Sequence, residues 1–408
     1  MAHLRCSAPE CGITLELHAR ALACPRCGDL LEVAIDAVES DPQDLKKLWI
    51  ERRSSYDRLD ASGVWRFREF LPRYDAGQVV TMPEGNVPLI RAQRAAEWAG
   101  LRNLWFKHLG WNPTGSFKDL GMTAGMTEAK FAGAGMVACA STGNTAASLA
   151  AYAARAGLIA RVYLPAGQAS ANKLAQAIDF GAEVIEIEGS FDDALEILLD
   201  SRDPDLYFLN SINPFRIEGQ KTAMFELLEQ FKWEIPDYVV VPGGNLGNSS
   251  AFGKAFKELK SFGLIDRLPR MVIVQAAGAN PLARLWRSDS RQFEAVKYPE
   301  TIATAIRIGN PRSWKKALRA IELTDGMAID VTDEEIGEAK ETIGRDGIGC
   351  EPASATTLAG LRKLVAAGIV DRDAVVAAVL TGHALKDTEY IIRSRKKLEL
   401  RDATGVHG

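Results

Sequence analysis

The sequence has no long apolar run, no excess of basic charge and no internal repeat. No apolar stretch approaches the roughly 18 residues that a helix needs to span a bilayer, and the first residues form no apolar signal core. The 408 residues carry a net charge of −4 with a pI near 5.9, which gives no general attraction to nucleic acid or anionic membranes. We therefore expect a cytoplasmic protein with neither nucleic acid nor a membrane as its partner.

Cysteine is scarce in most of the chain, because four of the six cysteines lie within the first 27 residues. Two closely spaced pairs, each followed by glycine, can present four thiolates tetrahedrally, the arrangement that zinc prefers. The candidate ligands are Cys6, Cys11, Cys24 and Cys27. This zinc would be structural, because four protein ligands leave no open position; the alternative is reduced or disulfide-linked cysteines without metal. His3 and His18 are further candidate ligands, whereas Cys139 and Cys350 are expected to be buried thiols.

The length of the chain exceeds what one hydrophobic core usually supports and predicts two or three domains. From residue 104 onward, apolar and β-branched runs alternate with helical patterns. The predicted strands are residues 104–106, 136–140, 160–164, 182–187, 206–209, 238–241, 271–274 and 374–380. This alternation predicts an α/β fold with mostly parallel sheets flanked by helices. Ligands of such sheets bind outside the carboxyl ends of the strands.

The stretch 112–119, Asn-Pro-Thr-Gly-Ser-Phe-Lys-Asp, places Lys118 just after a turn and at the start of a helical pattern. Asn-Pro and Thr-Gly are typical of turns, and residues 120–131 are rich in good helix formers. A lysine held at such a junction can form an imine with a carbonyl compound, most often pyridoxal phosphate (PLP). The alternative is a surface lysine beside an ordinary loop.

The glycine-rich stretch 241–248 follows a predicted buried strand and opens a helix. Its exposed N–H groups, together with the positive end of the helix, form a candidate cradle for a phosphate group. The residues of this cradle are Gly243, Gly244, Asn245, Leu246 and Gly247. No Gly-Lys-Ser/Thr follows, so the stretch is not a Walker loop. A tight turn that binds nothing is the alternative.

Three further polar motifs follow predicted strands. Residues 141–145 suit a carboxylate at a helix N-terminus, and Asn144 could donate to a phenolate oxygen, although these residue types also cap helices. The hydroxyl of Thr381 could hydrogen-bond a pyridine nitrogen. Residues 210–216 combine amides, a hydroxyl and Arg216, which favours bidentate contact with phosphate; the alternative is an exposed arginine at a helix start.

Together these segments resemble threonine synthase, particularly its plant-type branch, a PLP enzyme of fold type II (tryptophan synthase β-like). The resemblance runs from about residue 84 to 386, over two thirds of the chain. The motifs that carry it are residues 84–89, 114–122, 217–222, 241–248 and 275–281. Val87 replaces the family's threonine in the first motif, and Leu109 stands where many bacterial relatives carry glutamate. An N-terminal cysteine-rich ribbon occurs in some relatives.

The resemblance implies a role for each motif. Lys118 would hold PLP as an imine and later shuttle protons as the catalytic residue. The other cofactor contacts would be Phe117, Asn144, Gly243, Gly244, Asn245, Leu246, Gly247 and Thr381. The substrate contacts would be Lys107, Ser141, Thr142, Thr145, Asn210, Ser211, Arg216 and Asn248.

The implied domains are a zinc-ribbon-like segment (1–36), a large PLP-binding α/β domain (37–127 and 213–408) and a small α/β domain (128–212). The implied reaction converts O-phospho-L-homoserine and water into L-threonine and phosphate, in a homodimer. Cysteate synthase and threonine or serine dehydratase are the alternatives on the same scaffold. A non-catalytic interaction protein that kept the scaffold is a further alternative, against which an intact Lys118 argues.

Overall fold

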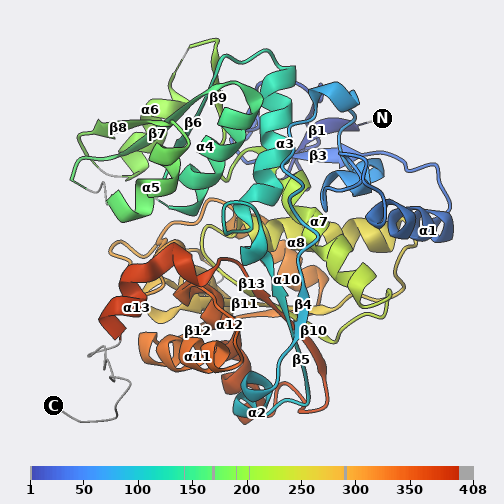
Figure 1. Ribbon diagram of the computed structural model, residues 1–408, viewed down its shortest axis with the longest axis vertical. Coiled ribbons are helices and arrows are strands. Elements are labelled where there is room, and N and C mark those ends of the chain that lie inside the picture. The colour runs from blue at the N-terminus through green and yellow to red at the C-terminus, as the bar shows by residue number, and fades with distance from the viewer. Residues whose placement is uncertain are drawn as a thin grey trace, which may run out of the picture.

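The computed structural model describes residues 2–141, 143–167, 171–189, 191–201, 203–288 and 292–394. The strands of this part of the chain form a small antiparallel sheet and two larger sheets, one in each of two lobes (Figure 1). The upper lobe in Figure 1 contains a four-stranded sheet and the lower lobe a six-stranded sheet. Helices pack against both larger sheets, which confirms the predicted α/β class.

The six-stranded sheet has the order β12-β11-β10-β13-β5-β4, and only the short edge strand β4 pairs antiparallel. Its strands are β4 (Leu89–Arg91), β5 (Asn103–His108), β10 (Tyr238–Pro242), β11 (Arg270–Ala276), β12 (Met327–Val331) and β13 (Val375–Leu380). Every residue of β10 is buried, because helices cover both faces of a parallel sheet.

Two groups of helices cover the six-stranded sheet. One face packs against α7 (Pro214–Gln230), α8 (Gly247–Ser261) and α10 (Trp314–Leu323). The other face packs against α2 (Arg94–Ala99), α11 (Asp333–Arg345) and α12 (Pro352–Ala366). Consecutive residues of β10 alternate between the two cores: Val239 and Val241 lie in the first, and Val240 lies in the second. The remaining helices of this lobe are α9 (Pro281–Arg287) and α13 (Thr388–Ser394).

The four-stranded sheet is parallel throughout, with the order β8-β7-β6-β9. Its strands are β6 (Met136–Ala140), β7 (Ile159–Pro165), β8 (Glu183–Ile187) and β9 (Leu206–Phe208). Its helices are α3 (Lys118–Phe131), α4 (Asn144–Ala156), α5 (Ala171–Asp179) and α6 (Phe191–Leu199). Apolar residues of α3, α4 and α5 share one core, and those of α6 lie in a second.

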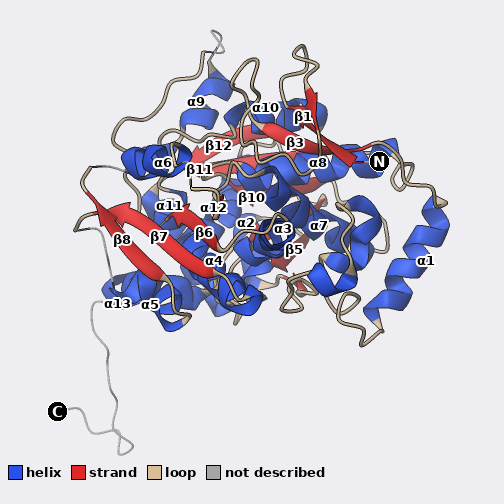
Figure 2. Cartoon of the chain, turned by 90° about the horizontal axis from the view of Figure 1, so that it is seen from above, coloured by secondary structure: helices blue, strands red, loops and turns tan. Residues whose placement is uncertain are grey.

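The N-terminal segment forms a small antiparallel sheet, β2-β1-β3, followed by α1 (Pro42–Arg53). Its strands are β1 (Ala2–Cys6), β2 (Thr14–Leu15) and β3 (Leu31–Ile35). We call residues 2–35 the ribbon. Figure 2 shows β1 and β3 beside α8 and α10, where Lys316 on α10 lies 3.9 Å from Glu32.

The predicted strands agree with the structure at each position, whereas β1, β2, β3, β4 and β12 were not predicted. Of these, β2 and β4 have only two and three residues, too few for a sequence pattern to distinguish them from loops. The predicted helix of residues 169–180 falls partly outside the described residues. The strands of the four-stranded sheet come from residues 136–208 and those of the six-stranded sheet from 89–108, 238–276, 327–331 and 375–380; the exact domain boundaries stay a prediction.

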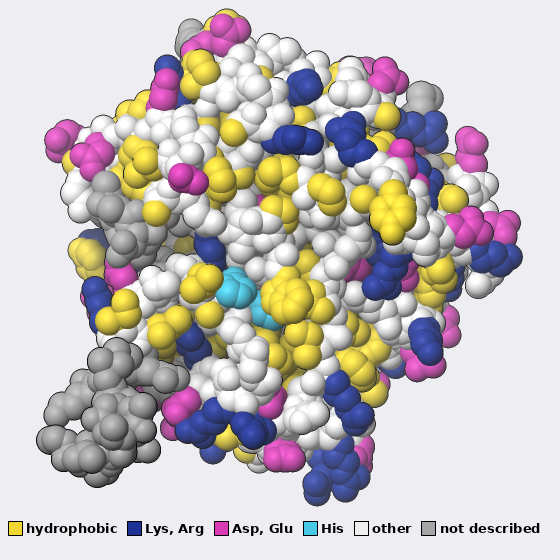
Figure 3. Space-filling model, in the orientation of Figure 1, with side chains coloured by type: hydrophobic (Ala, Val, Ile, Leu, Met, Phe, Trp, Pro, Cys, Tyr) yellow, Lys and Arg dark blue, Asp and Glu magenta, His cyan; other side chains and the backbone are white. Residues whose placement is uncertain are grey.

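The face of the molecule shown in Figure 3 carries charged side chains of both signs. Lys and Arg side chains are interspersed with Asp and Glu side chains on the face shown in Figure 3. Within the described part of the chain, none of the helices combines the length and apolar character that crossing a membrane requires.

Helices α3 and α7 approach each other closely because small residues line their contact. A Cβ atom at Gly219 would lie 1.8 Å from the carbonyl oxygen of Leu120. One at Gly121 would lie 2.8 Å from the carbonyl oxygen of Arg216. Because a side chain at either position would collide with backbone, the two helices depend on glycine there.

We predict that Gly219→Ala lowers the free energy of unfolding by about 1–3 kcal/mol, because the added methyl group forces α3 and α7 apart. The matched control is Gly344→Ala in α11, where a Cβ atom meets nothing within 4 Å. That change should stabilise the protein by up to about 1 kcal/mol, because alanine favours helix. Urea unfolding of both variants checks the prediction, and equal midpoints would contradict it.

Candidate active site

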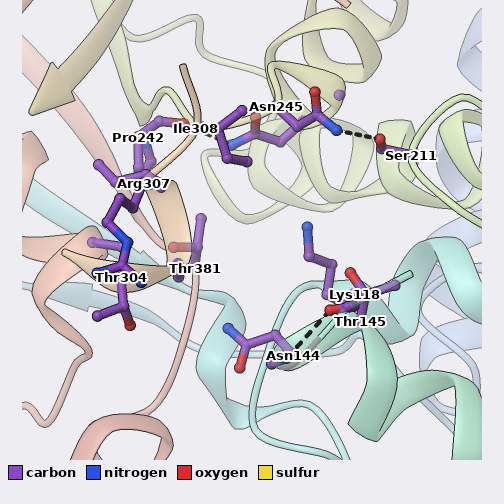
Figure 4. Close-up of a pocket in the computed structure, with 18 of the residues that line it drawn as sticks. Lys118, Asn144, Thr145, Ser211, Pro242, Asn245, Thr304, Arg307, Ile308 and Thr381 are labelled. Atoms are coloured by element: carbon purple, nitrogen blue, oxygen red, sulfur yellow. Dashed lines mark hydrogen bonds between the residues drawn. The ribbon is translucent and has the colours of Figure 1, made fainter. Parts of the chain in front are cut away.

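A cavity of about 1110 Å³ opens at the carboxyl ends of the strands of both parallel sheets, where ligands of such sheets bind. The predicted site residues that line it are Phe117, Lys118, Ser141, Asn144, Thr145, Asn210, Ser211, Arg216, Gly244, Asn245, Leu246, Gly247, Asn248 and Thr381. Figure 4 shows Lys118 pointing into the space between Asn144, Thr381 and the Asn245–Ser211 pair. Residues far apart in the sequence thus meet around one amine.

Hydrogen bonds on both sides fix the turn that carries Lys118. The N–H of Phe117 donates to the carbonyl of Thr381 at 2.9 Å. The carboxylate of Asp119 accepts from the N–H and hydroxyl of Thr114 at 2.7 and 2.6 Å. It also accepts from the hydroxyl of Ser148, on α4, at 2.6 Å. Lys118 is therefore held between the strand end of one lobe and a helix of the other.

The amine of Lys118 is suited to proton transfer near neutral pH. Burial and, to a lesser extent, the positive charge of Arg216 lower its pKa to about 7, against the opposing effect of Glu351. Its Nζ lies 4.3 Å from the ring centroid of Phe117. A lysine at this pKa is partly neutral at pH 7, as a nucleophile or general base requires.

Glu351, which the sequence reasoning missed, joins two of the predicted cofactor contacts. Its carboxylate accepts from the side-chain amide of Asn144 at 3.0 Å and from the hydroxyl of Thr381 at 3.3 Å. Burial raises the pKa of Glu351. Glu351 precedes Pro352 at the start of α12, so from sequence it resembles an ordinary helix start.

The glycine-rich segment after β10 is tightly packed. A Cβ atom at Gly243 would lie 2.7 Å from the side chain of Ile273, and one at Gly244 would lie 3.1 Å from Ile306. Leu246 adopts the left-handed conformation with a φ of 63°, which costs a non-glycine residue free energy and is characteristic of functional sites. Asn245 donates to Ser211 at 2.5 Å.

Arg216 is a buried cation whose guanidinium is only partly paired. Its side chain is 1% exposed, and its Nη1 donates to the carbonyl of Leu209 at 3.1 Å. Within the described residues, its Nε and Nη2 have no hydrogen-bond partner. Burial lowers the pKa of Arg216 to about 10. Because an uncompensated buried charge is costly, these free N–H groups favour an anionic ligand.

Three predicted site residues lie elsewhere or outside the described part of the chain. Lys107 does not line the cavity: its buried Nζ donates to Glu226 on α7, to Gln230 at 2.7 Å and to the carbonyl of Val87 at 3.0 Å. Since this ion pair engages the amine, we leave Lys107 out of the proposed site. Gly243 is not among the residues that line the cavity, although Pro242 and Gly244 on either side of it are. Thr142 falls outside the described residues.

The cavity has further lining residues that the sequence reasoning missed. Lys386 donates to the carbonyl of Thr114 at 3.1 Å and to the side chain of Gln176 on α5. Residues 304–310 form one wall, and the N–H of Arg312 donates to Asn245 at 2.8 Å. This wall has neither helical nor strand periodicity, so no sequence signal indicated it.

Comparison with known proteins shows the class of protein to which the chain belongs. The family model described as pyridoxal-phosphate dependent enzyme matches residues 80–382. The fold resembles the processed form of threonine deaminase isoform 2 from Solanum lycopersicum, with a TM-score of 0.64, 17% identity and coverage of 91% of this chain and 98% of that one. The chain therefore belongs to the PLP-dependent enzymes of fold type II, as predicted.

Two archaeal relatives narrow the assignment. Threonine synthase from Methanocaldococcus jannaschii is 47% identical over 391 residues, which are 95% of this chain and 94% of that protein. Threonine synthase from Methanosarcina acetivorans is 45% identical over 395 residues, with coverage of 96% and 94%. Within its class the chain belongs to the threonine synthase family, and it is a PLP-dependent lyase of amino-acid biosynthesis.

The pKa of Lys118 leads to a prediction for the apoprotein. The rate at which added PLP becomes linked to the lysine should rise with pH and level off above about pH 7, because only the neutral amine attacks a carbonyl. Arg216→Met should move the midpoint to higher pH, since it removes a positive charge that disfavours protonation. Stopped-flow absorbance measures the rate. A midpoint near the ordinary 10.5, or one that Arg216→Met lowers, would contradict the prediction.

Proposed function

We propose that the protein converts O-phospho-L-homoserine and water into L-threonine and phosphate in threonine biosynthesis. The observation that carries this proposal is the buried guanidinium of Arg216, which lines the cavity that also holds Lys118 and has two N–H groups without a partner among the described residues. A substrate with its own phosphate would supply the missing acceptors. Relatives at 45–47% identity that are threonine synthases support the same assignment.

The residues around Lys118 fit PLP. We assign Lys118 the covalent attachment, Phe117 packing near the ring, Asn144 the phenolate oxygen and Thr381 the pyridine nitrogen. The phosphate of the cofactor would lie against residues 243–247, where Gly243 and Gly244 leave room for no side chain and the N-terminus of α8 favours an anion. When bound, PLP supplies delocalisation of the negative charge that develops on the substrate carbon atoms.

The remaining lining residues can hold the substrate at its two ends. We assign Ser141 and Thr145, near the N-terminus of α4, to the carboxylate of the substrate, and Thr142, outside the described residues, is assigned the same contact from the sequence alone. Its phosphate would contact Asn210, Ser211, Arg216 and Asn248. In the structure the side chain of Asn210 is hydrogen-bonded to the backbone of Ala140 at 3.0 Å, which fixes the end of β6 beside this site.

Lys118 can move the protons of the reaction. Its amine, with a pKa of about 7, would accept the proton from Cα of the substrate. Loss of a second proton, from Cβ, would then accompany departure of phosphate from Cγ, and a proton would be returned at Cγ. Water would add its hydroxyl at Cβ, and Cα would regain a proton before L-threonine is released. Arg216 would stabilise the negative charge on the departing phosphate, and closure of the two lobes would exclude water until that step.

Product analysis tests the function. We expect the PLP-loaded protein to release phosphate from O-phospho-L-homoserine with formation of L-threonine. Lys118→Ala should lose both turnover and the absorbance of the lysine–PLP linkage, because no other group replaces the amine. The matched control is Lys130→Ala, an exposed lysine in the last turn of the same helix, which should retain both.

The same assay separates the alternatives on this scaffold. Cysteate from O-phospho-L-serine and sulfite, without threonine from O-phospho-L-homoserine, would overturn the substrate and keep the role of Lys118. Threonine formation by Lys118→Ala at the wild-type rate would overturn the catalytic assignment. Mass spectrometry identifies the products.

The ribbon is proposed to hold one structural zinc ion. The four sulfur atoms of its cysteines lie within 4.8 Å of one another, with Cys6 and Cys27 separated by 3.4 Å and Cys11 and Cys24 by 3.6 Å. Four thiols at such separations match the donor set of a tetrahedral zinc site. His18 is engaged elsewhere, since its Nδ1 lies 2.9 Å from the carboxylate of Glu128.

We predict one zinc ion per chain in protein purified without chelators, measured by elemental analysis. Cys11→Ser should lose most of the metal, because a neutral hydroxyl replaces a thiolate ligand. Cys139→Ala, which removes a fully buried thiol outside the cluster, should retain it. Equal zinc content in the two variants, or none in the unmodified chain, would contradict the assignment.

A homodimer in the cytoplasm completes the proposal. The family resemblance supports the dimer, and the six free cysteines are consistent with a compartment that keeps thiols reduced.

A further inference from the structure

The segment that carries the proposed phosphate contacts also carries two apolar residues that face away from the cavity. Asn210, Ser211 and Arg216 line the cavity. Ile212 and Phe215, which lie between them in sequence, are 9% and 1% exposed. Phe215 packs in the core of the ribbon, and Ile212 belongs to a cluster that ribbon residues cover, so the segment lies between the ribbon and the cavity.

Phe215 is part of the hydrophobic core of the ribbon. The buried residues of this core are Leu4, Cys6, Cys11, Cys24, Leu31, Val33 and Phe215. Among these described residues, Phe215 alone comes from outside the ribbon. The ribbon is too small to build a large core by itself, and Phe215 supplies its one large aromatic side chain there. The first turn of α7 and the ribbon therefore share one core.

Ile212 connects the same segment to a different part of the ribbon. It packs with Phe208 of β9 and with residues of β6 and α6, and Leu22 and Leu30 of the ribbon cover this cluster. The ribbon thus contacts the small lobe through Leu22 and Leu30 and the first turn of α7 through its own core. The phosphate-binding segment lies where these parts meet.

Polar contacts fix the ribbon to the surrounding helices. Lys254 on α8 donates to the carbonyl of Val33 at 2.5 Å and pairs with Glu218 on α7. At the opposite end, His18 contacts Glu128 on α3, and Arg20 donates to the carbonyl of Ala132 at 2.6 Å. Because these contacts involve both α8 and α3, the ribbon cannot shift without breaking several of them.

We propose that the ribbon positions the substrate's phosphate site and that Phe215 is the positioning residue that connects the two. This inference rests on the proposed function, since it concerns the phosphate of that substrate. Within the described residues, the guanidinium of Arg216 has one hydrogen bond, to the carbonyl of Leu209, and no carboxylate partner. Its place is therefore set by the backbone of residues 209–216, which Ile212 and Phe215 anchor to the ribbon.

The test compares phosphate binding with binding of a ligand that lacks phosphate. In the PLP-loaded protein, Phe215→Ala should weaken the binding of inorganic phosphate by about ten- to a hundredfold. A loss of this size is expected when a charged contact is displaced by about 1 Å. KM for O-phospho-L-homoserine should rise by a similar factor, while the affinity for L-threonine, which lacks phosphate, should stay within about twofold of wild type. Calorimetry and absorbance titration give these constants.

Two matched variants control for loss of stability. Phe215→Leu keeps an apolar side chain and should recover most of the phosphate affinity. Phe225→Leu alters a fully buried phenylalanine of the same helix that packs in the core of the large sheet, and it should leave phosphate affinity unchanged. Phosphate affinity equal to wild type in Phe215→Ala would overturn the proposal, as would parallel losses for phosphate and L-threonine in that variant.

A change on the ribbon side tests the ribbon directly. Leu31→Ala lies in the shared core and should reproduce the selective loss of phosphate affinity, with less than additive effects when combined with Phe215→Ala. Wild-type phosphate affinity in Leu31→Ala would show that Phe215 acts within α7 alone, and it would overturn the role of the ribbon. A wild-type protein that binds phosphate but does not turn over O-phospho-L-homoserine would contradict the proposed function and not this inference.

Discussion

The site depends on the close approach of α3 and α7. Lys118 begins α3, and Arg216 lies in the first turn of α7. Glycines bring the helices together: a Cβ atom at Gly125 would lie 3.0 Å from the side chain of Arg216. Gly125 thus leaves the space through which the arginine stem passes along α3. With larger residues at this contact, the lysine and the guanidinium could not both reach one cavity.

The electrostatics of α7 and its neighbours show why Arg216 is exceptional. Other buried cations around this helix have carboxylate partners: Arg66 pairs with Glu229 at 2.6 Å, and Lys221 pairs with Glu218 at 2.5 Å. Such pairing offsets the cost of removing a charge from water. Arg216 has no such partner among the described residues, so a ligand anion gains the interaction that a protein carboxylate supplies elsewhere. The charge of Arg216 also helps to keep the amine of Lys118 partly neutral.

Local sequence patterns predicted the lobes and most of the cavity, because parallel sheets bring their strand ends to one edge. Lys107 shows the limit of this reasoning. A central parallel strand is apolar on both faces, so its sequence does not tell which side chains turn toward the cavity, and Lys107 turns toward Glu226. Glu351 was missed for a different reason. It lies thirty positions before Thr381, and only the pairing of the two segments brings its carboxylate to that hydroxyl.

The ribbon shows that a local sequence pattern can predict a segment's own structure without predicting where that segment packs. Cysteine spacing predicts a compact four-thiol segment, because its ligands are close in sequence. Nothing in that spacing tells which surface the segment covers. Phe215, in the first turn of α7, is indistinguishable by pattern from a residue of the helix's own apolar face. Its burial in the ribbon core places the four-cysteine ribbon beside the first turn of α7, which carries Arg216. The stability of the ribbon and the position of this buried arginine therefore depend on the same contact.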